Sequence, residues 1–242
     1  ARAVSDALPL MQRSKAIVGV LRPAPPPARL EFAEISDRAR FENLVKASQG
    51  GVLDADIVAV VSNHEHGGVR QRADKLGVSF LHFPKPWDSE SYQRIMRKTG
   101  AEWAALSGWL KLAIGLDARK TFNIHPALLS QLDGRFGGPG MYGHHVHEAV
   151  KAALDAGEVD ESGFTMHFVT DEYDRGPVFA EARVRLVPGM TADEIGKAVN
   201  QLEHRFQPLL TNMVVRGEIS WDGVEAGSLK IPGNLQKSLG MI

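Results

Sequence analysis

An amide and an imidazole stand two residues apart in the segment Asn123-Ile-His-Pro126. On a β-strand, residues at this spacing point to the same face, and Pro126, which has no N–H to donate, ends the ladder of hydrogen bonds. The amide of Asn123 suits a developing oxyanion, and a nearby carboxylate favours the imidazolium form of His125. Together, the three groups suit nucleophilic attack on a carbonyl-like carbon. We therefore expect a carboxylate of the acidic segment 171–174 to approach His125.

The segments around this pair alternate between strand and helix patterns. Strands are expected at 30–35, 57–61, 78–83, 102–106, 121–124, 165–169 and 178–186, and helices at 39–48, 69–76, 88–98, 146–156 and 191–216, with a last short strand at 218–221. This alternation predicts an α/β fold with a mostly parallel central sheet and helices on both faces. Open sheets of this kind bind ligands beyond the carboxyl ends of their strands, which is where Asn123 and His125 are expected.

Residues 1–28 read as an N-terminal, proline-rich extension, and residues 29–242 as the globular domain. Residues 15–21 have the composition of a strand. The segment Arg22-Pro-Ala-Pro-Pro-Pro27 that follows is a stiff, extended spacer that cannot join the interior of a sheet. We expect the extension to lie on the surface.

Composition narrows the class of partner. The 242 residues carry a net charge of −1, which gives no general attraction to nucleic acid or to anionic membranes, and no apolar run approaches the roughly 20 residues that span a bilayer. The absence of cysteine excludes disulfides and makes the cytoplasm the expected location. We expect a monomer or homodimer that binds small molecules and neither nucleic acid nor membrane.

Two other sequence patterns suggest a dinucleotide site and a metal site, and neither is expected. The stretch Gly138-Pro-Gly-Met-Tyr-Gly143 matches G-x-G-x-x-G, but no strand precedes it, so a substrate-covering loop fits better than a dinucleotide site. Histidines cluster at His144, His145 and His147, and again at His64 and His66. Neighbouring histidines at a helix start point in different directions, so we expect no metal site.

Three motifs together resemble phosphoribosylglycinamide formyltransferase, the folate-dependent enzyme family of purine biosynthesis. They are the segments 123–129, 140–150 and 167–178, and the similarity covers roughly 29–223. The resemblance implies a Rossmann-like formyltransferase fold. It also implies one-carbon transfer, with 10-formyltetrahydrofolate as co-substrate and the amine of glycinamide ribonucleotide as acceptor.

The resemblance further implies a role for individual residues. Asn123 and His125 would polarise the formyl group, and Asp174 would support His125 and relay protons. The residues that match the folate-binding positions are Leu110, Lys111, Leu112, Ala113, Asn123, Thr170, Asp171, Glu172, Tyr173 and Asp174. Asn200 and Glu203 match the segment that touches the acceptor.

One stretch departs from the family pattern. The family binds the acceptor's phosphate with a glycine-containing loop after its first strand, whereas the stretch matched here, residues 35–43, has no glycine and contains Asp37. Arg38 and Arg40 would supply a replacement clamp for the phosphate or would be ordinary solvated charges. The altered loop leaves open another amine acceptor or hydrolysis of formyltetrahydrofolate. A catalytically silent folate-binding protein is disfavoured, because such a protein has no need of Asn123, His125 and Asp174 together.

Overall fold

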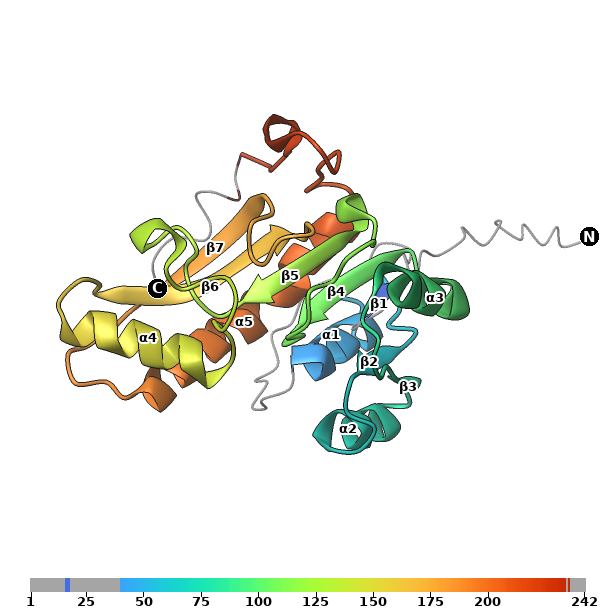
Figure 1. The fold of residues 1–242 in the computed structure, drawn as a ribbon, viewed down its shortest axis with the longest axis horizontal. Coiled ribbons are helices and arrows are strands. Elements are labelled where there is room, and N and C mark those ends of the chain that lie inside the picture. Colours follow the sequence, from blue (N-terminus) through green and yellow to red (C-terminus); the bar gives the residue numbers. More distant parts are fainter. Residues whose placement is uncertain (1–15, 18–39, 234, 236–242) are drawn as a thin grey trace, which may run out of the picture.

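A twisted central sheet organises the molecule (Figure 1), and the computed structural model describes residues 16–17, 40–233 and 235. The sheet has the order β1-β4-β5-β6-β7, and a second, two-stranded sheet pairs β2 with β3. The bounds are β1 (Ala16–Ile17), β2 (Val60–Ser62), β3 (Phe80–His82), β4 (Trp103–Ser107), β5 (Thr121–His125), β6 (Glu161–Phe168) and β7 (Val178–Arg185). The pairings β1·β4, β4·β5 and β2·β3 are parallel, and β6 runs antiparallel to both its neighbours.

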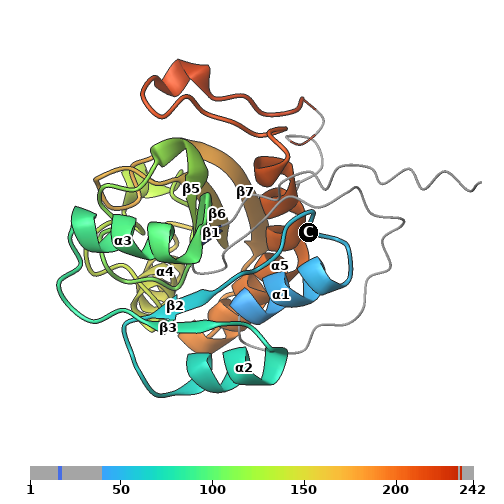
Figure 2. The ribbon, with the colours of Figure 1, turned by 90° about the vertical axis from the view of Figure 1, so that its right-hand side faces the viewer.

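Helices cover both faces of the central sheet, as Figure 2 shows: α3 and α4 lie on one face, and α1 and α5 lie on the other. The bounds are α1 (Arg40–Gln49), α2 (Gly68–Leu76), α3 (Ser89–Thr99), α4 (His144–Asp155) and α5 (Ala192–Val215). Short 3₁₀ turns occupy Ala118–Lys120, Leu132–Gly134 and Ala226–Ser228. The predicted α/β fold, with parallel strand pairing and helices on both faces of the sheet, is confirmed.

The ends of the helices follow from local sequence. The carboxylate of Asp88 accepts a hydrogen bond from the Ser91 N–H at the start of α3. At the start of α5, Thr191 and Glu194 form a capping box, in which each side chain bonds to the other's backbone N–H. Gly77 ends α2 with a φ of 68°, a left-handed conformation that costs glycine little. These caps fix where the helices begin and end beside the sheet.

Apolar side chains of β5 and β6 fill the core on one face of the sheet. Phe122 and Ile124 of β5 and Phe164, Met166 and Phe168 of β6 are almost completely buried. These five side chains share one face of the sheet, since they alternate along each strand and oppose one another across the β5–β6 pair. Truncating one such phenylalanine to alanine would cost about 3–5 kcal/mol. This packing makes β5 and β6 a rigid base for polar side chains at their ends.

Two expectations change. The strand expected at 218–221 is wrong, because Ser220 forms only an isolated bridge with Lys230. Within the segment 1–28, Ala16 and Ile17 form β1 and pair with Trp103 and Ala104, so these two residues lie at the edge of the sheet. The strand expected at 30–35 lies outside the described residues.

Within the described part of the chain, no helix combines the length and the apolar character needed to cross a membrane.

Candidate active site

Strand β5 presents two polar side chains near its carboxyl end. Asn123 is half-buried, and His125 is 4% exposed. The antiparallel register places His167 of β6 opposite Asn123 and Thr165 opposite His125. Directly opposed residues of an antiparallel pair share one face of the sheet, so four polar side chains form two rows on one face.

The carboxylate of Asp174 lies over this face. Its Oδ2 atom is 3.7 Å from Nδ1 of His125, and its Oδ1 atom is 3.4 Å from Nε2 of His167. Nδ2 of Asn123 lies 3.5 Å from Oδ1. The backbone N–H of Gly138 donates a hydrogen bond of 2.9 Å to Oδ2. The expected approach of an acidic-segment carboxylate to His125 is therefore present, and Asp174 supplies it.

Asp174 reaches His125 because the segment 169–177 folds back along the sheet. The N–H of Val169 donates to the Thr121 carbonyl at 2.9 Å, so the segment starts near the beginning of β5. Its return closes where Phe168 N–H donates to the Pro177 carbonyl at 3.0 Å. Asp174 itself has a left-handed backbone, with φ 52°. This turn carries the carboxylate back to the carboxyl end of β5.

The environment of Asp174 favours its ionised form. Burial raises the pKa of this carboxyl group. The hydrogen bond with His167, the charge of His125 and the N–H of Gly138 lower it, and the net result is a pKa below the usual value for aspartate. Asp174 is therefore a carboxylate at neutral pH.

A backbone carbonyl fixes the orientation of the His125 ring. Nε2 of His125 lies 2.7 Å from the carbonyl oxygen of Phe136, which is fully buried. Because a carbonyl only accepts, Nε2 must carry hydrogen and donate. The other ring nitrogen, Nδ1, then faces Asp174. This geometry supports an imidazolium at His125 with a partner at each nitrogen.

His167 is a member of the site that sequence reasoning missed. It is buried, its Nδ1 donates to the carbonyl of Phe168 at 2.8 Å, and its Nε2 lies 3.2 Å from Nδ2 of Asn123. The signal available was its position at the end of the strand that leads into the acidic segment. Its role depends on the pairing of β5 with β6, which the sequence does not state.

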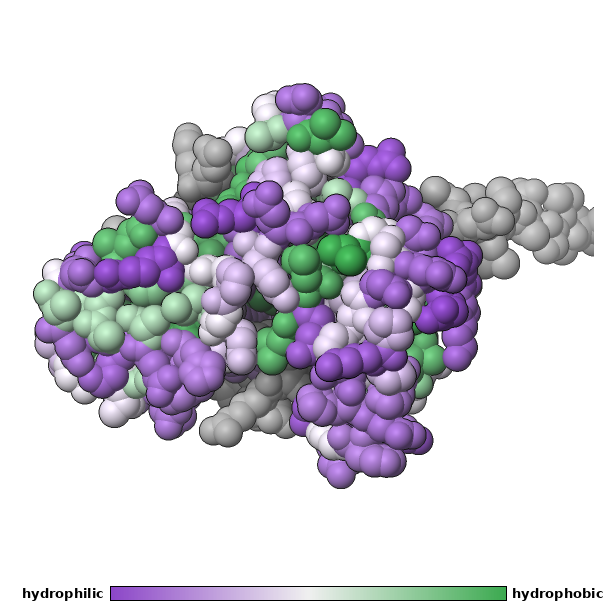
Figure 3. Space-filling model, in the orientation of Figure 1, coloured by the Kyte–Doolittle hydropathy of each residue, from purple (hydrophilic) through white to green (hydrophobic). Residues whose placement is uncertain are grey.

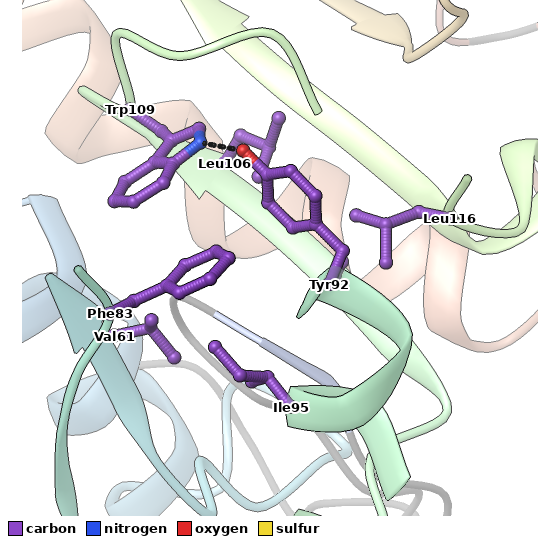
Figure 4. Close-up of a pocket in the computed structure, with 8 residues that line it drawn as sticks. Val61, Phe83, Tyr92, Ile95, Leu106, Trp109 and Leu116 are labelled. Atoms are coloured by element: carbon purple, nitrogen blue, oxygen red, sulfur yellow. Dashed lines mark hydrogen bonds between the residues drawn. The ribbon is translucent and has the colours of Figure 1, made fainter. Parts of the chain in front are cut away.

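The four residues Leu110, Lys111, Leu112 and Ala113 follow β4 and rest on an aromatic cluster. Trp109 stacks on Phe83 with ring centroids 5.8 Å apart. As Figure 4 shows, Nε1 of Trp109 donates to the hydroxyl of Tyr92, at 2.8 Å. That hydroxyl in turn donates to the Leu112 carbonyl at 3.1 Å. The apolar cavity that these rings line measures about 10 Å³, enough for about one water molecule and far too small for a pteridine. The aromatic cluster therefore supports residues 110–113 and is not itself a pocket for the folate.

The outer surface of the same region is partly apolar. Leu110 is 44% exposed, and the Nζ atom of Lys111 lies 4.6 Å from the centroid of the Trp87 ring. Figure 3 shows hydrophobic residues beside a hollow near the middle of this face. In the acidic segment, Thr170 and Glu172 bond weakly to each other at 3.4 Å, and Tyr173 is exposed.

The predicted acceptor residues lie on α5. Glu203 is completely buried, and its Oε2 accepts a hydrogen bond of 3.2 Å from Nδ2 of Asn200. One turn further, Nε2 of Gln207 donates to Ser107 at the carboxyl end of β4, at 3.4 Å. The polar face of α5 therefore meets the sheet one strand away from β5.

The predicted phosphate clamp is described only in part. Arg38 lies outside the described residues. Arg40 is the first residue of α1, and only its backbone is described.

The histidines at the start of α4 have partners of their own. His144 lies 3.6 Å from Asp193 and 3.5 Å from Glu148, and His145 lies 3.1 Å from Glu148. Across the described residues, no group of three or more histidine, aspartate or glutamate side chains is arranged to hold a metal ion.

Comparison with known proteins decides the family. The family model described as formyl transferase matches residues 32–211. The chain belongs to the formyl transferase family. The resemblance inferred from the three motifs is thus confirmed, and Asn123, His125 and Asp174 all lie inside the matched range.

Within the formyl transferases, two similar proteins carry the same name. The chain is 34% identical over 199 residues to the chloroplastic phosphoribosylglycinamide formyltransferase of Arabidopsis thaliana, an alignment covering 77% of this chain. It spans 65% of that relative's length. Against the Escherichia coli K12 phosphoribosylglycinamide formyltransferase, identity is 27%, with 75% of this chain and 84% of the relative covered.

A solved structure supports the fold. Glycinamide ribonucleotide transformylase 1 from Symbiobacterium toebii superposes with a TM-score of 0.65 at 24% identity, covering 79% of this chain and 88% of that one. This formyl transferase therefore shares its fold with a transformylase.

Proposed function

We propose that this formyl transferase moves a formyl group from 10-formyltetrahydrofolate to the amine of glycinamide ribonucleotide, a step of purine biosynthesis. The observation that carries the proposal is the contact of Asp174 with His125, 3.7 Å apart and beside Asn123. The names of the Arabidopsis and Escherichia coli relatives support the choice of acceptor.

In the proposed reaction, the acceptor's amine attacks the formyl carbon. A bond forms between this nitrogen and carbon, and the carbonyl oxygen becomes an oxyanion. Asn123 donates to that oxyanion. The positive charge of the His125 imidazolium stabilises it, because Nε2 of this ring donates to Phe136 and Nδ1 faces Asp174. Nδ2 of Asn123 lies 3.2 Å from Nε2 of His167 and makes only a 3.5 Å contact with Asp174, so this amide can turn an N–H to substrate.

Collapse of the intermediate breaks the bond between the formyl carbon and N10 of the folate. The acceptor nitrogen gives up one proton, and N10 takes one, so the reaction balances without a covalent enzyme intermediate. Asp174 keeps His125 charged and accepts the travelling proton through water. Reactant positioning supplies the rest of the acceleration.

The remaining residues divide between the two substrates. We assign Leu110, Lys111, Leu112 and Ala113, together with Thr170, Asp171, Glu172, Tyr173 and Asp174, to the folate. The polar edge of α5, at Asn200 and Glu203, is assigned to the acceptor. Arg38 and Arg40 are assigned to its phosphate.

The decisive experiment measures formyl transfer from 10-formyltetrahydrofolate with and without glycinamide ribonucleotide. Turnover that depends on the acceptor supports the proposal. Equal deformylation without acceptor would identify a hydrolase, and tight folate binding without turnover would identify a silent binding protein. Either of the last two results overturns the proposal.

The phosphate assignment has its own test. Replacing Arg38 and Arg40 together with alanine should raise the KM of the acceptor and leave the KM of the folate nearly unchanged. Arg70→Ala, on the exposed surface of α2, is the matched control. An acceptor KM that does not move removes these arginines from the site.

The location and assembly of the protein stay predictions. The cytoplasm is expected from composition, whereas the Arabidopsis relative is chloroplastic by name. The same holds for the monomeric or homodimeric state, and for the division into an extension at 1–28 and a domain at 29–242.

A further inference from the structure

The chain that follows β5 leaves the site and then returns to it. We call residues 126–138 the return loop. It begins directly after His125, and its far end contacts both members of the charged pair: the Phe136 carbonyl accepts from His125, and the Gly138 N–H donates to Asp174. The position of this loop therefore sets the surroundings of both groups.

The first half of the return loop is bound to β6. The hydroxyl of Thr165 accepts from the Leu129 N–H at 3.0 Å and lies 2.8 Å from the Ala127 carbonyl. Thr165 is fully buried and stands opposite His125 in the β5–β6 register. The residue beside the histidine thus holds the loop that comes after it.

One strand further out, Glu181 of β7 continues the same row. It stands opposite Thr165, and its side chain is 14% exposed. Its Oε1 atom accepts from the Ser130 N–H at 3.1 Å, and its Oε2 atom accepts from the Ser130 hydroxyl at 2.7 Å. Arg183 donates to Oε2 at 3.1 Å. Both polar groups of Ser130 that can donate are therefore bound to one carboxylate.

Thr165 has one hydroxyl hydrogen and two acceptors in reach. Glu181 Oε1 is 3.0 Å away, and the Ala127 carbonyl is 2.8 Å away. The hydrogen must be shared between loop and strand or given to one of them. The two bonds from Ser130 do not depend on this choice, so they are the firm link between Glu181 and the loop.

The two halves of the return loop are in contact. A Cβ atom built at Gly137 would lie 2.4 Å from Cδ2 of Leu129 and 3.3 Å from Cβ of Asp174. Gly137 is therefore packed between the first half of the loop and the carboxylate residue. A displacement at Ser130 and Leu129 would be passed on to Gly137, Gly138 and Asp174.

We propose that Glu181 is a positioning residue, which holds the return loop through Ser130 and Thr165 and so fixes His125 and Asp174 for reaction. It lies two strands from His125, about 10 Å at the usual spacing of strands, and does not touch substrate. The inference rests on the proposed formyl transfer, because only a reaction at His125 and Asp174 makes the loop's position matter.

The test compares variants that separate the bonds from the packing. Glu181→Gln keeps an acceptor oxygen for Ser130 and gains an amide donor for Thr165, whereas Glu181→Ala removes every bond. Arg185→Ala is the matched control, because it lies on the same face of β7 but pairs with Asp160 at the exposed end. Acceptor-dependent formyl transfer is measured against pH for each purified protein, with thermal unfolding to count folded molecules.

We expect Glu181→Ala to lower kcat about 10-fold or more per folded molecule, because small misplacements of reacting groups are costly, while the folate KM changes less. We also expect the acidic limb of its pH profile to move to higher pH. The Gly138 N–H lowers the pKa of Asp174, and a loosened loop weakens that bond. Glu181→Gln and Arg185→Ala should stay near the wild-type profile.

The outcomes separate the two proposals. Wild-type protein without acceptor-dependent transfer contradicts the proposed function. Wild-type transfer together with an unchanged kcat and pH profile in Glu181→Ala contradicts the positioning role alone. A loss of activity that only tracks the loss of folded protein, with an unmoved pH profile, also contradicts it, since that is the pattern of a purely structural residue.

Discussion

Nδ2 of Asn123 and Nε2 of His167 lie 3.2 Å apart across two antiparallel strands. Nδ1 of His167 donates to the Phe168 carbonyl, which fixes the ring, and its Nε2 also lies 3.4 Å from Oδ1 of Asp174. The fixed ring therefore positions the amide of Asn123 beside it before any substrate arrives.

Two substitutions at His167 separate its two bonds. Asparagine places its amide near the position of Nδ1 and keeps the bond to Phe168, whereas glutamine reaches the position of Nε2 and keeps the link to Asn123. We expect His167→Asn to lower kcat more, by about 10-fold, which corresponds to roughly 1.4 kcal/mol in the barrier. Steady-state kinetics of both variants decide the point. A larger loss of kcat in His167→Gln than in His167→Asn would show that the link to Asn123 is unimportant.

At Asp174, removal of the charge should stop most of the reaction. We expect Asp174→Asn to lower kcat on the order of 10²-fold or more, the usual size of general acid–base assistance. Since its pKa is lowered, wild-type activity should hold as the pH falls to about 5, well above the usual aspartate value of about 3.9. Unchanged turnover in the variant would remove Asp174 from the mechanism.

The same carboxyl group links stability to pH. Its pKa is lower in the folded protein than the usual value of about 3.9 in an unfolded chain. The stabilisation from its ionised form is therefore complete above about pH 5 and is lost as the pH falls through the lowered folded value. Urea unfolding at pH 7 and at pH 3 should show a wild-type advantage over Asp174→Asn that shrinks at the lower pH. An advantage that grows on acidification would contradict this sign.

Gly137 offers a test of close packing behind Asp174. A methyl group there would press on Leu129 and Asp174, so Gly137→Ala should lower kcat several-fold, by roughly 1 kcal/mol of barrier. Adding Leu129→Ala makes room and should restore part of the loss, a coupling that a double-mutant cycle measures. Gly227→Ala is the control, because nothing lies within 4 Å of the added atom. Strict additivity of the two changes would rule out the contact.

Tyr92 supports the segment assigned to folate. Tyr92→Phe leaves the Trp109 N–H and the Leu112 carbonyl without this hydroxyl, which should cost about 1–3 kcal/mol of stability and raise the folate KM. Burial, opposed by the Trp109 hydrogen bond and aided by the charge of Tyr173, raises the pKa of Tyr92 to about 12.

The raised pKa of Tyr92 also sets the pH range over which this residue stabilises the folded protein. The Tyr92 contribution should be complete below about pH 10, the usual tyrosine value, and should fade between pH 10 and about 12. Urea unfolding at pH 8 and pH 11 measures it, with exposed Tyr142→Phe as the control. Equal pH dependence in wild type and Tyr92→Phe would contradict the assignment.

Local patterns were enough to predict much of this fold. Asp88, Thr191 and Gly77 mark helix ends through bonds to near neighbours, and Asn123 and His125 lie on a strand end because a two-residue period and a proline require it. Such features depend on residues a few positions apart. They can be read from one chain.

Other features depend on which strands become neighbours. His167 and Glu181 enter the site only through the β5–β6–β7 register, which packing sets and which no local pattern states. The expected strand at 218–221 failed for the same reason, because Ser220 finds only Lys230 as a partner. The assignment of Asp174, rather than another acid of its segment, required the family motif.

The left-handed backbone at Asp174 limits which residues the site can accept. Aspartate, asparagine and glycine adopt this conformation readily, whereas most side chains there cost roughly 1–2 kcal/mol. Among the three that fit, only aspartate carries a carboxylate. Glutamate would keep the charge but strain the turn, and asparagine would suit the turn but lose the charge. The left-handed turn therefore favours aspartate at position 174. Any substitution there loses either the backbone conformation or the carboxylate.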